Sequence, residues 1–386
     1  MMPKQPPWND PRVRGWFFQT VAVLLAAGFF LNLASNTLDN LRQLNVASGF
    51  SFLEHTAGFG ISQSLIEYSE ASTYGRAFLV ALLNTLLVAG LGIVLATVLG
   101  FVIGIAWLSP NWLLSRLAGV YIEFFRNIPL LLQILFWYTA VLSNLPGPRE
   151  SLRAGSFLLN KRGLYMPAPV PQTGFEYVLW AFAIAAIASL ILWRYSQWRR
   201  ANAGAGLPVF WRTAGLLAGL PVLVYLILGA PLHFETPELH GFNFSGGLRA
   251  MPELLALLFA LSIYTAAFIA EIVRAGIQAV NWGQTEAGLA LGLRRTDVLR
   301  LIVIPQALRV IIPPLTSQFL NLTKNSSLAA ALAYPELASV FAGTVLNQTG
   351  QAIEVLAITM AVYLSISLAT SFAMNLYNSR IALVER

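Results

Sequence analysis

Four long stretches of this chain contain no charged side chain, and they limit what the chain can fold into. Residues 15–38, 77–115, 213–234 and 355–379 have no Asp, Glu, Lys or Arg. About 20 apolar residues in a helix span the hydrocarbon core of a bilayer, and a helix satisfies its own backbone hydrogen bonds there. Charged residues are only 11% of the chain, against roughly 25% in soluble domains. The chain is therefore predicted to be an all-α, polytopic integral membrane protein.

The apolar segments predict eight transmembrane helices. The second is long enough to tilt, and it is expected to stop at Ser109 and Pro110 because proline cannot continue a helix interior. The first is interpreted as a retained helix rather than a signal peptide, because it is long and residues 36–38 lack a small-x-small cleavage site. The eight predicted segments are 16–35, 78–108, 121–142, 177–194, 213–232, 251–275, 308–334 and 354–377.

Lys and Arg predict the orientation of these helices, because they are more frequent in cytoplasmic segments. With the N-terminus inside, 15 of the 24 basic residues fall in inner segments and 7 in outer segments. Arg126 and Lys324 lie at or within spans. This bias predicts that both termini are cytoplasmic, and it places residues 284–309 in the cytoplasm. The outer segments 36–76, 143–176 and 233–250 are either simple connectors or a docking surface for a periplasmic protein.

Several kinds of site are not expected in this chain. It has no Cys, its three histidines all fall in outer segments, and no metal-ligand spacing or catalytic triad is found. A phosphate-binding loop needs Gly-Lys before Ser or Thr, and none of Lys4, Lys161 and Lys324 follows a glycine. The chain is therefore expected to bind no cofactor or metal and to hydrolyse no ATP. Its net charge of +7 is explained by membrane orientation, and no nucleic-acid partner is expected.

Residues 284–309 form a polar, basic interruption between apolar runs. A short helix is expected around Glu286, whose carboxylate in the first turn is favoured by the helix dipole. Gly292 allows a sharp change of direction. Thr296 is expected to cap a second helix that runs until Pro305. Such a jointed segment can transmit a push between subunits; the alternative is an amphipathic loop lying on the membrane surface.

The spacing in this segment resembles the EAA loop of bacterial ABC importer permeases, which reads E-A-A, three residues, G, nine residues, I-x-L-P. Two positions depart from it: Gly288 replaces an alanine and Ile304 replaces a leucine. In that family the loop forms a short cytoplasmic helix that binds in a cleft of the ATPase subunit. The resemblance implies that the residues coupled to the ATPase are Glu286, Ala287, Gly288, Leu291, Gly292, Arg294, Arg295 and Pro305.

Three other segments resemble the polar amino-acid (histidine, glutamate and glutamine) branch of that family. They are YTAAFIAEIVRAG at 264–276, FFRNIPLLLQILFW at 124–137 and LNLTKNSSL at 320–328. The enlarged plan, with an extra N-terminal helix and an inserted helix pair, is most similar to a permease subunit of the general L-amino-acid importers. The implied divisions are an N-terminal helix and outer loop at 1–76, core parts at 77–142 and 251–386, an insertion at 143–250, and a coupling loop at 283–305.

The resemblance also implies the partners. They are an ABC ATPase that carries ATP and Mg, a second permease subunit that is related but different, a periplasmic amino-acid-binding protein, and the amino acid itself. The chain would lie among the lipids of the bacterial inner membrane. The competing hypothesis is an ion-coupled secondary amino-acid transporter, which needs acids inside the membrane; the interiors of the predicted spans are nearly free of acids. A membrane-bound assembly or signalling subunit is a third possibility.

Two interrupted spans are candidates for the substrate pathway, because broken helices mark binding sites in transporters. One interruption holds Arg126 and Asn127; the alternative is that Arg126 pairs locally with Glu123. The other holds Lys324, whose charge is costly inside a membrane unless it faces a partner or water; the alternative is that it reaches the outer surface. Glu271 and Arg274 are expected to pair with each other. The candidate pathway residues are Arg126, Asn127, Lys324, Asn325, Ser326 and Ser327.

Overall fold

The computed structural model describes residues 11–43, 49–203, 209–241 and 243–381. These residues divide into two units. The first combines Met1–Ile134 with Leu257–Arg386, and the second is Leu135–Ala256. The two chain ends, which are predicted to be cytoplasmic, fall outside the described residues.

The first unit is helical. Irregular helical turns at Ser51–Glu54, Leu299–Val303, Ser326–Leu332 and Ala338–Val345 join or extend its regular helices. The regular helices that lie in it or begin or end in it are α1 (Pro11–Gln43), α2 (Tyr74–Trp107), α3 (Trp112–Asn127), α4 (Leu130–Leu135), α7 (Pro252–Gln278), α8 (Trp282–Ala290), α9 (Arg295–Val298), α10 (Ile304–Asn325), α11 (Leu346–Thr349) and α12 (Ala352–Ile381).

Small residues let α2 pack closely against α7. A side chain added at Gly100 would lie 2.6 Å from Ile269, and one at Gly104 would lie 2.7 Å from the carbonyl oxygen of Ala270. Close approach at small residues is how helices associate inside a membrane. Thr73 caps the start of α2 by accepting a hydrogen bond from the Arg76 amide. The helix ends at Trp107, just before the predicted stop at Pro110.

Residues from the predicted outer segment 36–76 contribute to the core of this unit. Phe52 and Ala57 are buried together with Tyr74 of α2, Phe341 and Val355. The segment after α1 is therefore folded against α2, the turns at Ala338–Val345 and α12.

Six of the eight predicted spans appear as helices that are long and apolar enough to cross a membrane. The predicted span over 121–142 is broken at the predicted interruption, where α3 and the helical residues that begin with α4 meet at an angle of 105°. Proline disfavours helical backbone in the residue before it, and Ile128, which precedes Pro129, is extended at φ −98° and ψ 127°. The prediction over 213–232 gives a shorter helix, α6 (Val209–Ile227).

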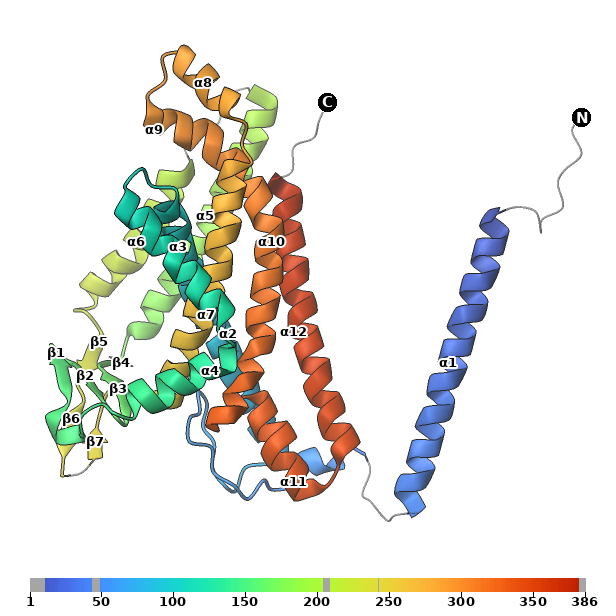
Figure 1. Ribbon diagram of the computed structural model, residues 1–386. Coiled ribbons are helices and arrows are strands. Elements are labelled where there is room, and N and C mark those ends of the chain that lie inside the picture. Colours follow the sequence, from blue (N-terminus) through green and yellow to red (C-terminus); the bar gives the residue numbers. More distant parts are fainter. Residues whose placement is uncertain (1–10, 44–48, 204–208, 242, 382–386) are drawn as a thin grey trace, which may run out of the picture. The chain divides into compact units, whose positions relative to one another are not determined.

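The second unit contains α5 (Phe175–Ala203) packed on α6, together with short strands. One antiparallel sheet has the order β1-β2-β3-β8, and β4–β5 and β6–β7 form two-stranded sheets. The strands gather at one end of the α5–α6 pair (Figure 1). They are β1 (Leu152–Ala154), β2 (Phe157–Asn160), β3 (Gly163–Met166), β4 (Ala168–Pro171), β5 (Leu232–Glu235), β6 (Glu238–His240), β7 (Asn243–Ser245) and β8 (Leu248–Ala250).

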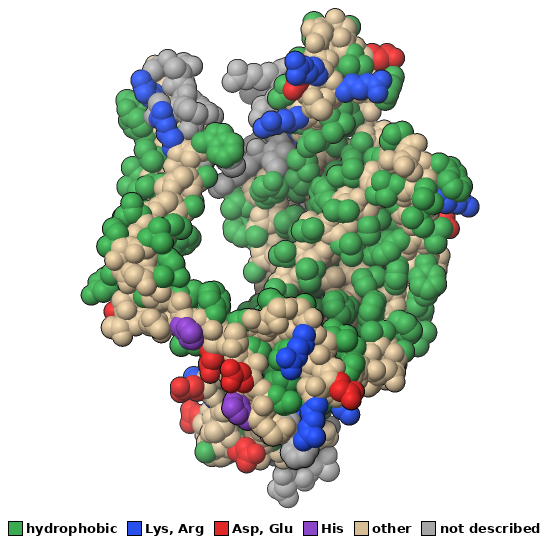
Figure 2. Space-filling model, turned by 90° about the vertical axis from the view of Figure 1, so that its left-hand side faces the viewer, with side chains coloured by type: hydrophobic (Ala, Val, Ile, Leu, Met, Phe, Trp, Pro, Cys, Tyr) green, Lys and Arg blue, Asp and Glu red, His purple; other side chains and the backbone are tan. Residues whose placement is uncertain are grey.

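These strands lie in the predicted outer segments 143–176 and 233–250. The fold is mostly helical, as predicted, but a purely helical description omits this strand module. Its register aligns Arg153 with Leu158, Leu158 with Tyr165, and Tyr165 with Arg249 across the sheet. Figure 2 shows charged side chains of both signs over the strands, whereas the side chains over the helices are mostly hydrophobic.

Candidate coupling site and translocation path

Helix α8 carries the predicted coupling residues and begins earlier than expected. The Asn281 side chain accepts a hydrogen bond from the Gly283 amide at 2.8 Å and caps the helix at Trp282. Asn is a strong helix cap because its side-chain oxygen satisfies an amide that has no partner in the first turn. Glu286 therefore lies in the second turn of α8, and the prediction that it stands in the first turn is wrong.

Gly292 makes the predicted change of direction after α8. Its φ is +81°, a left-handed conformation that glycine adopts without strain. The Gly292 amide donates to the Leu289 carbonyl at 2.9 Å, and the Leu293 amide donates to the Gly288 carbonyl at 3.2 Å. The joint between α8 and the next helix is therefore held by backbone hydrogen bonds.

The helix after this joint differs from the prediction at both ends. It begins at Arg295, and Arg294 rather than Thr296 precedes it, with no side-chain cap. The helical path does not stop at Pro305. It continues through Leu299–Val303 into α10, because Pro305 stands in the first turn of α10. Pro305 is the second residue of α10 and directly follows the irregular helical turns of Leu299–Val303.

Gly288 is the contact point between α8 and the following helical turns. It is buried, and a Cβ atom there would lie 2.8 Å from Ile302 Cδ1 and 2.9 Å from Val298 Cγ2. The glycine that departs from the family pattern thus allows α8 to lie directly on Val298 and Ile302. The two helical segments act as one packed body.

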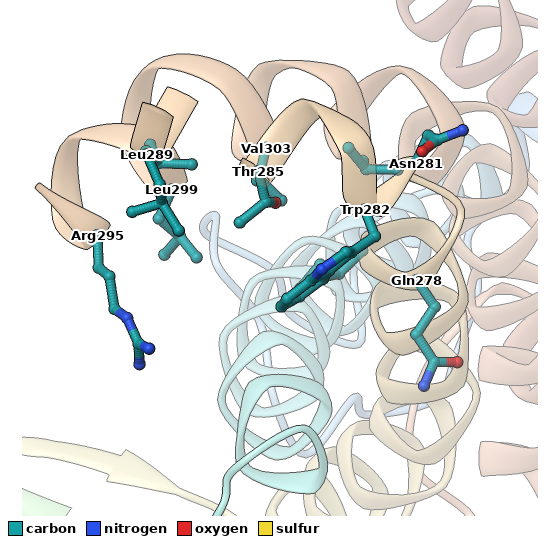
Figure 3. Close-up of a pocket in the computed structure, with 11 residues that line it drawn as sticks. Gln278, Asn281, Trp282, Thr285, Leu289, Arg295, Leu299 and Val303 are labelled. Carbon is teal, nitrogen blue, oxygen red and sulfur yellow. The ribbon is translucent and has the colours of Figure 1, made fainter. Parts of the chain in front are cut away.

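The other faces of α8 are divided between a cavity and the outside. Trp282, Thr285 and Leu289 lie at helical spacing on the face that lines a cavity of about 590 Å³ (Figure 3). Ala287 and Leu291 lie four residues apart on a different face, and Leu291 is 81% exposed. The remaining lining residues come from the end of α7 and from 295–303: Ile277, Gln278, Val280, Asn281, Arg295, Val298, Leu299 and Val303.

The predicted coupling residues are thus mostly exposed but do not all face one way. Glu286, Ala287, Leu291 and Arg294 are exposed, and Gly288 is buried. Arg295 lines the cavity. Within the described residues, no hydrogen bond or ion pair involves the side chains of Glu286, Arg294 and Arg295, so these charges are available to a partner.

Arg126 has a different partner from the predicted Glu123. Its Nη1 atom lies 3.9 Å from Glu271 Oε2, and its guanidinium carbon lies 5.1 Å from the centre of the Phe268 ring. Arg274 donates to Glu271 Oε1 at 2.6 Å, which confirms the predicted pair. Arg126 therefore ties α3 to α7. Asn127 donates to the carbonyl of Glu123 at 2.7 Å and so satisfies the end of α3.

The regular helix is interrupted near Lys324, as predicted. Some polar side chains there bond to the end of the helix, and that of Lys324 is exposed. Helix α10 ends at Asn325. Ser326 is buried and donates to the Thr323 carbonyl at 2.7 Å, and Ser327 donates to the Lys324 carbonyl at 2.8 Å. These serines close the helix end, whereas the Lys324 side chain is exposed.

Two further polar residues of α10 share the exposed face with Lys324. Ser317 and Asn321 are exposed, and the spacing of 317, 321 and 324 places all three on one helical stripe. The sequence analysis read the polar residues consecutively and missed this stripe, although their spacing of four and three was visible in the sequence.

Glu336 is a buried acid that the sequence analysis also missed. It is 0% exposed, and its carboxylate accepts hydrogen bonds from the Ala338 and Ser339 amides at 2.9 and 2.7 Å. Tyr363 of α12 donates to it at 2.6 Å. Thr85 of α2 accepts from the Leu337 amide at 3.0 Å. The carboxylate therefore holds the turn after α10 to α12, beside the Thr85 contact to α2.

Similarity to known proteins identifies the family. A family model described as the inner membrane component of binding-protein-dependent transport systems matches residues 199–383. A chain of Escherichia coli (strain K12) named as the amino-acid ABC transporter permease YhdX is 56% identical over 378 residues, which cover 98% of this chain and 96% of that one. This chain belongs to the ABC transporter permeases.

Two more permeases are similar over nearly their whole length. The general L-amino acid transport system permease AapQ of Rhizobium johnstonii is 53% identical over 98% of this chain and 94% of that one. The glutamate/glutamine/aspartate/asparagine transport system permease BztB of Rhodobacter capsulatus is 43% identical over 98% and 96%. This permease is thus a multi-pass inner-membrane transport subunit and not an enzyme, and ATP hydrolysis belongs to a separate subunit. Permeases of this family work in general with an ATPase and a binding protein.

Proposed function

We infer that this permease imports amino acids across the bacterial inner membrane as one membrane subunit of an ATP-driven importer. The observation that carries this inference is the jointed unit of α8, Gly292 and α9, which presents exposed residues beyond the end of a membrane-spanning helix. The substrate class is supported by three relatives named for amino-acid transport. The ATPase partner binds ATP and Mg, and this chain binds neither.

Coupling to the ATPase runs through the face of α8 that carries Ala287 and Leu291. Both side chains are small or apolar and exposed, as a helix that enters a cleft requires. Glu286 and Arg294 flank this face with charges that have no partner among the residues that the structure describes. Closure of the ATPase around ATP displaces α8. Because Gly288 packs directly on Val298 and Ile302, the displacement of α8 also moves these two residues. The displacement reaches α10 without a hinge, since the helical path is continuous from Arg295 to Asn325.

The substrate passes along the stripe of Ser317, Asn321 and Lys324. Polar and charged side chains inside a membrane face a partner or a water-filled passage because lipid does not hydrate them. The stripe is exposed on α10, so it faces the second, related but different permease subunit across the passage. Lys324 attracts the carboxylate of the amino acid. Asn325, Ser326 and Ser327 shape the end of α10 beside it, and Arg126 and Asn127 support the passage by fixing α3.

The strand module of the second unit is the docking surface for the periplasmic amino-acid-binding protein. A polar hollow of about 700 Å³ is lined there by Arg162, Tyr165, Phe244 and Arg249, among others. Arg249 lies over the Tyr165 ring at 5.9 Å, and its Nε donates to the Arg162 carbonyl at 3.1 Å. Arg and Tyr are enriched where proteins bind one another. Five of the seven outer basic residues lie in this module, against the usual bias of positive charge toward the inside.

Reconstituted uptake tests the proposed function. The chain is co-purified with its ATPase and second permease, placed in vesicles with the binding protein outside, and supplied with a panel of radiolabelled amino acids. Uptake is expected only with ATP and Mg on the ATPase side. Accumulation driven by an ion gradient without nucleotide would instead identify a secondary transporter, and no flux of any amino acid would indicate an assembly or signalling subunit.

The stripe makes a specific prediction. Asn321→Ala and Lys324→Ala are expected to raise the substrate concentration for half-maximal uptake about tenfold each, the cost of one lost hydrogen bond to a charged group. Thr316→Ala is the matched control, because Thr316 lies on α10 outside the stripe and bonds back to the Ile312 carbonyl. Uptake by both stripe variants that equals wild type at low amino-acid concentration would place the passage elsewhere.

A further inference from the structure

The cavity behind α8 lies at the depth of the inner lipid headgroups. Helix α7 has 27 residues, a length of about 40 Å at 1.5 Å per residue. The hydrocarbon core is about 30 Å thick, and the headgroup layers bring the bilayer to about 40–45 Å. Ile277 and Gln278, in the last turn of α7, therefore lie among the headgroups of the cytoplasmic leaflet, and both line the cavity.

The cavity has the lining that an anionic amphiphile requires. Leu289, Val298 and Leu299 make an apolar wall, and Thr285 and Arg295 add polar groups. Trp282 is 70% exposed at the rim, and tryptophan favours the membrane interface. Arg295 has no hydrogen bond or ion pair within the described residues. In Figure 3 the side chains of Arg295, Leu299 and Trp282 extend to the same side of the helical roof formed by α8 and residues 295–303.

We propose that this cavity binds an anionic phospholipid of the cytoplasmic leaflet, with Arg295 on the phosphate and the acyl chain along Leu289 and Leu299. Basic pockets at the cytoplasmic ends of transmembrane helices are suited to anionic headgroups. The bound lipid braces α8 against the end of α7 on the face opposite to the ATPase. This site goes beyond the proposed transport function and does not depend on which solute the permease carries.

Native mass spectrometry of the purified transporter complex tests the site. Wild-type complex is expected to retain added phosphatidylglycerol and to retain phosphatidylcholine less. Arg295→Gln is expected to weaken phosphatidylglycerol retention about fivefold, the contribution of one basic residue to binding an anionic lipid surface. Arg294→Gln is the matched control, because Arg294 is the exposed neighbour that does not line the cavity; it is expected to retain the lipid as wild type does.

A second variant separates the cavity from general surface charge. Thr285→Phe fills the cavity without changing any charge, and it is expected to displace phosphatidylglycerol as strongly as Arg295→Gln does. Equal loss in Arg294→Gln and Arg295→Gln, or full retention in Thr285→Phe, would overturn the proposal. Displacement of the lipid by millimolar inorganic phosphate would also overturn it, because the site would then bind a free anion. The readout is lipid mass, so failure here leaves the proposed transport function standing.

Discussion

Glu336 shows how one buried carboxyl group can organise the end of a transport helix. It lies between the last two candidate spans and is bonded by Tyr363 and two backbone amides. Burial raises the pKa of Glu336, and these hydrogen bonds partly oppose that rise. A buried acid in a transporter suggests proton coupling, but here the carboxylate is occupied by structural hydrogen bonds.

The raised pKa predicts a pH-dependent stability. Between the unperturbed Glu pKa of 4.5 and the higher folded value, the folded state binds more protons than the unfolded state. Stability is therefore greatest below about 4.5 and falls as pH rises through this window. Thermal unfolding in detergent across this range should show the fall in wild type and a flatter profile in Glu336→Gln. Identical pH profiles would contradict the assignment of this titration to Glu336.

Removing the Tyr363 hydroxyl tests the same cluster without changing charge. Tyr363→Phe is expected to cost about 1–3 kcal/mol, because Glu336 then loses a donor inside the protein. The free energy of unfolding is the measurement. Tyr377→Phe, on an exposed position of the same helix, is the control and is expected to be neutral.

A substitution at Gly288 tests whether the packing of this residue or its agreement with the family pattern determines activity. Gly288→Ala restores the alanine of the family pattern, yet its methyl group would meet Val298 and Ile302 at under 3 Å. Overpacking of this kind costs about 1–3 kcal/mol, so ATP-driven uptake should fall. The double variant with Val298→Ala makes room and is expected to recover uptake. Full activity in Gly288→Ala alone would show that α8 does not transmit its motion through this contact.

Among the helices, the break between α3 and α4 falls at residues 126–129, where the sequence predicted an interruption of the third span. Pro129 was visible in the sequence, but its effect depends on what satisfies the exposed helix end. The Gln133 side chain donates to the carbonyls of Phe125 and Ile128, each at 3.0 Å, and thereby stabilises the bend. Gln133→Leu is expected to cost about 1–3 kcal/mol in unfolding free energy. A neutral result would mean that Pro129 alone holds the bend.

Local sequence patterns predicted an element correctly where one local feature, such as a long apolar segment or a glycine, determined the structure. The apolar segments predicted six helices that are long enough to cross a membrane, and Gly292 predicted the turn after α8. The cap predicted at Thr296 was wrong because the helix begins at Arg295, one residue before Thr296, and the stop predicted at Pro305 was wrong because the helical path continues into α10. The strands are three or four residues long, too short to show a clear alternation, and their pairing joins residues as distant as Tyr165 and Arg249.

For the whole molecule, the positions of the side chains show which of the predicted residues share a face, and motif spacing alone does not show this. The coupling residues were predicted as one set, but α8 separates them into an exposed face at Ala287 and Leu291, a buried contact at Gly288 and a cavity face beside Arg295. The pathway was predicted as consecutive residues from Lys324. The proposed stripe reaches back to Ser317 along α10; its spacing was visible in the sequence, and the structure adds that all three of its residues are exposed.

Cysteine cross-linking tests the central claim most directly, because the chain has no native Cys. Leu291→Cys and Thr285→Cys place one thiol on the exposed face of α8 and one on its cavity face. In the assembled transporter, a short bifunctional reagent should join Leu291→Cys to the ATPase subunit and stop ATP-driven amino-acid uptake, while Thr285→Cys should give no such product. Cross-linking of Thr285→Cys but not Leu291→Cys to the ATPase would contradict the coupling surface described above.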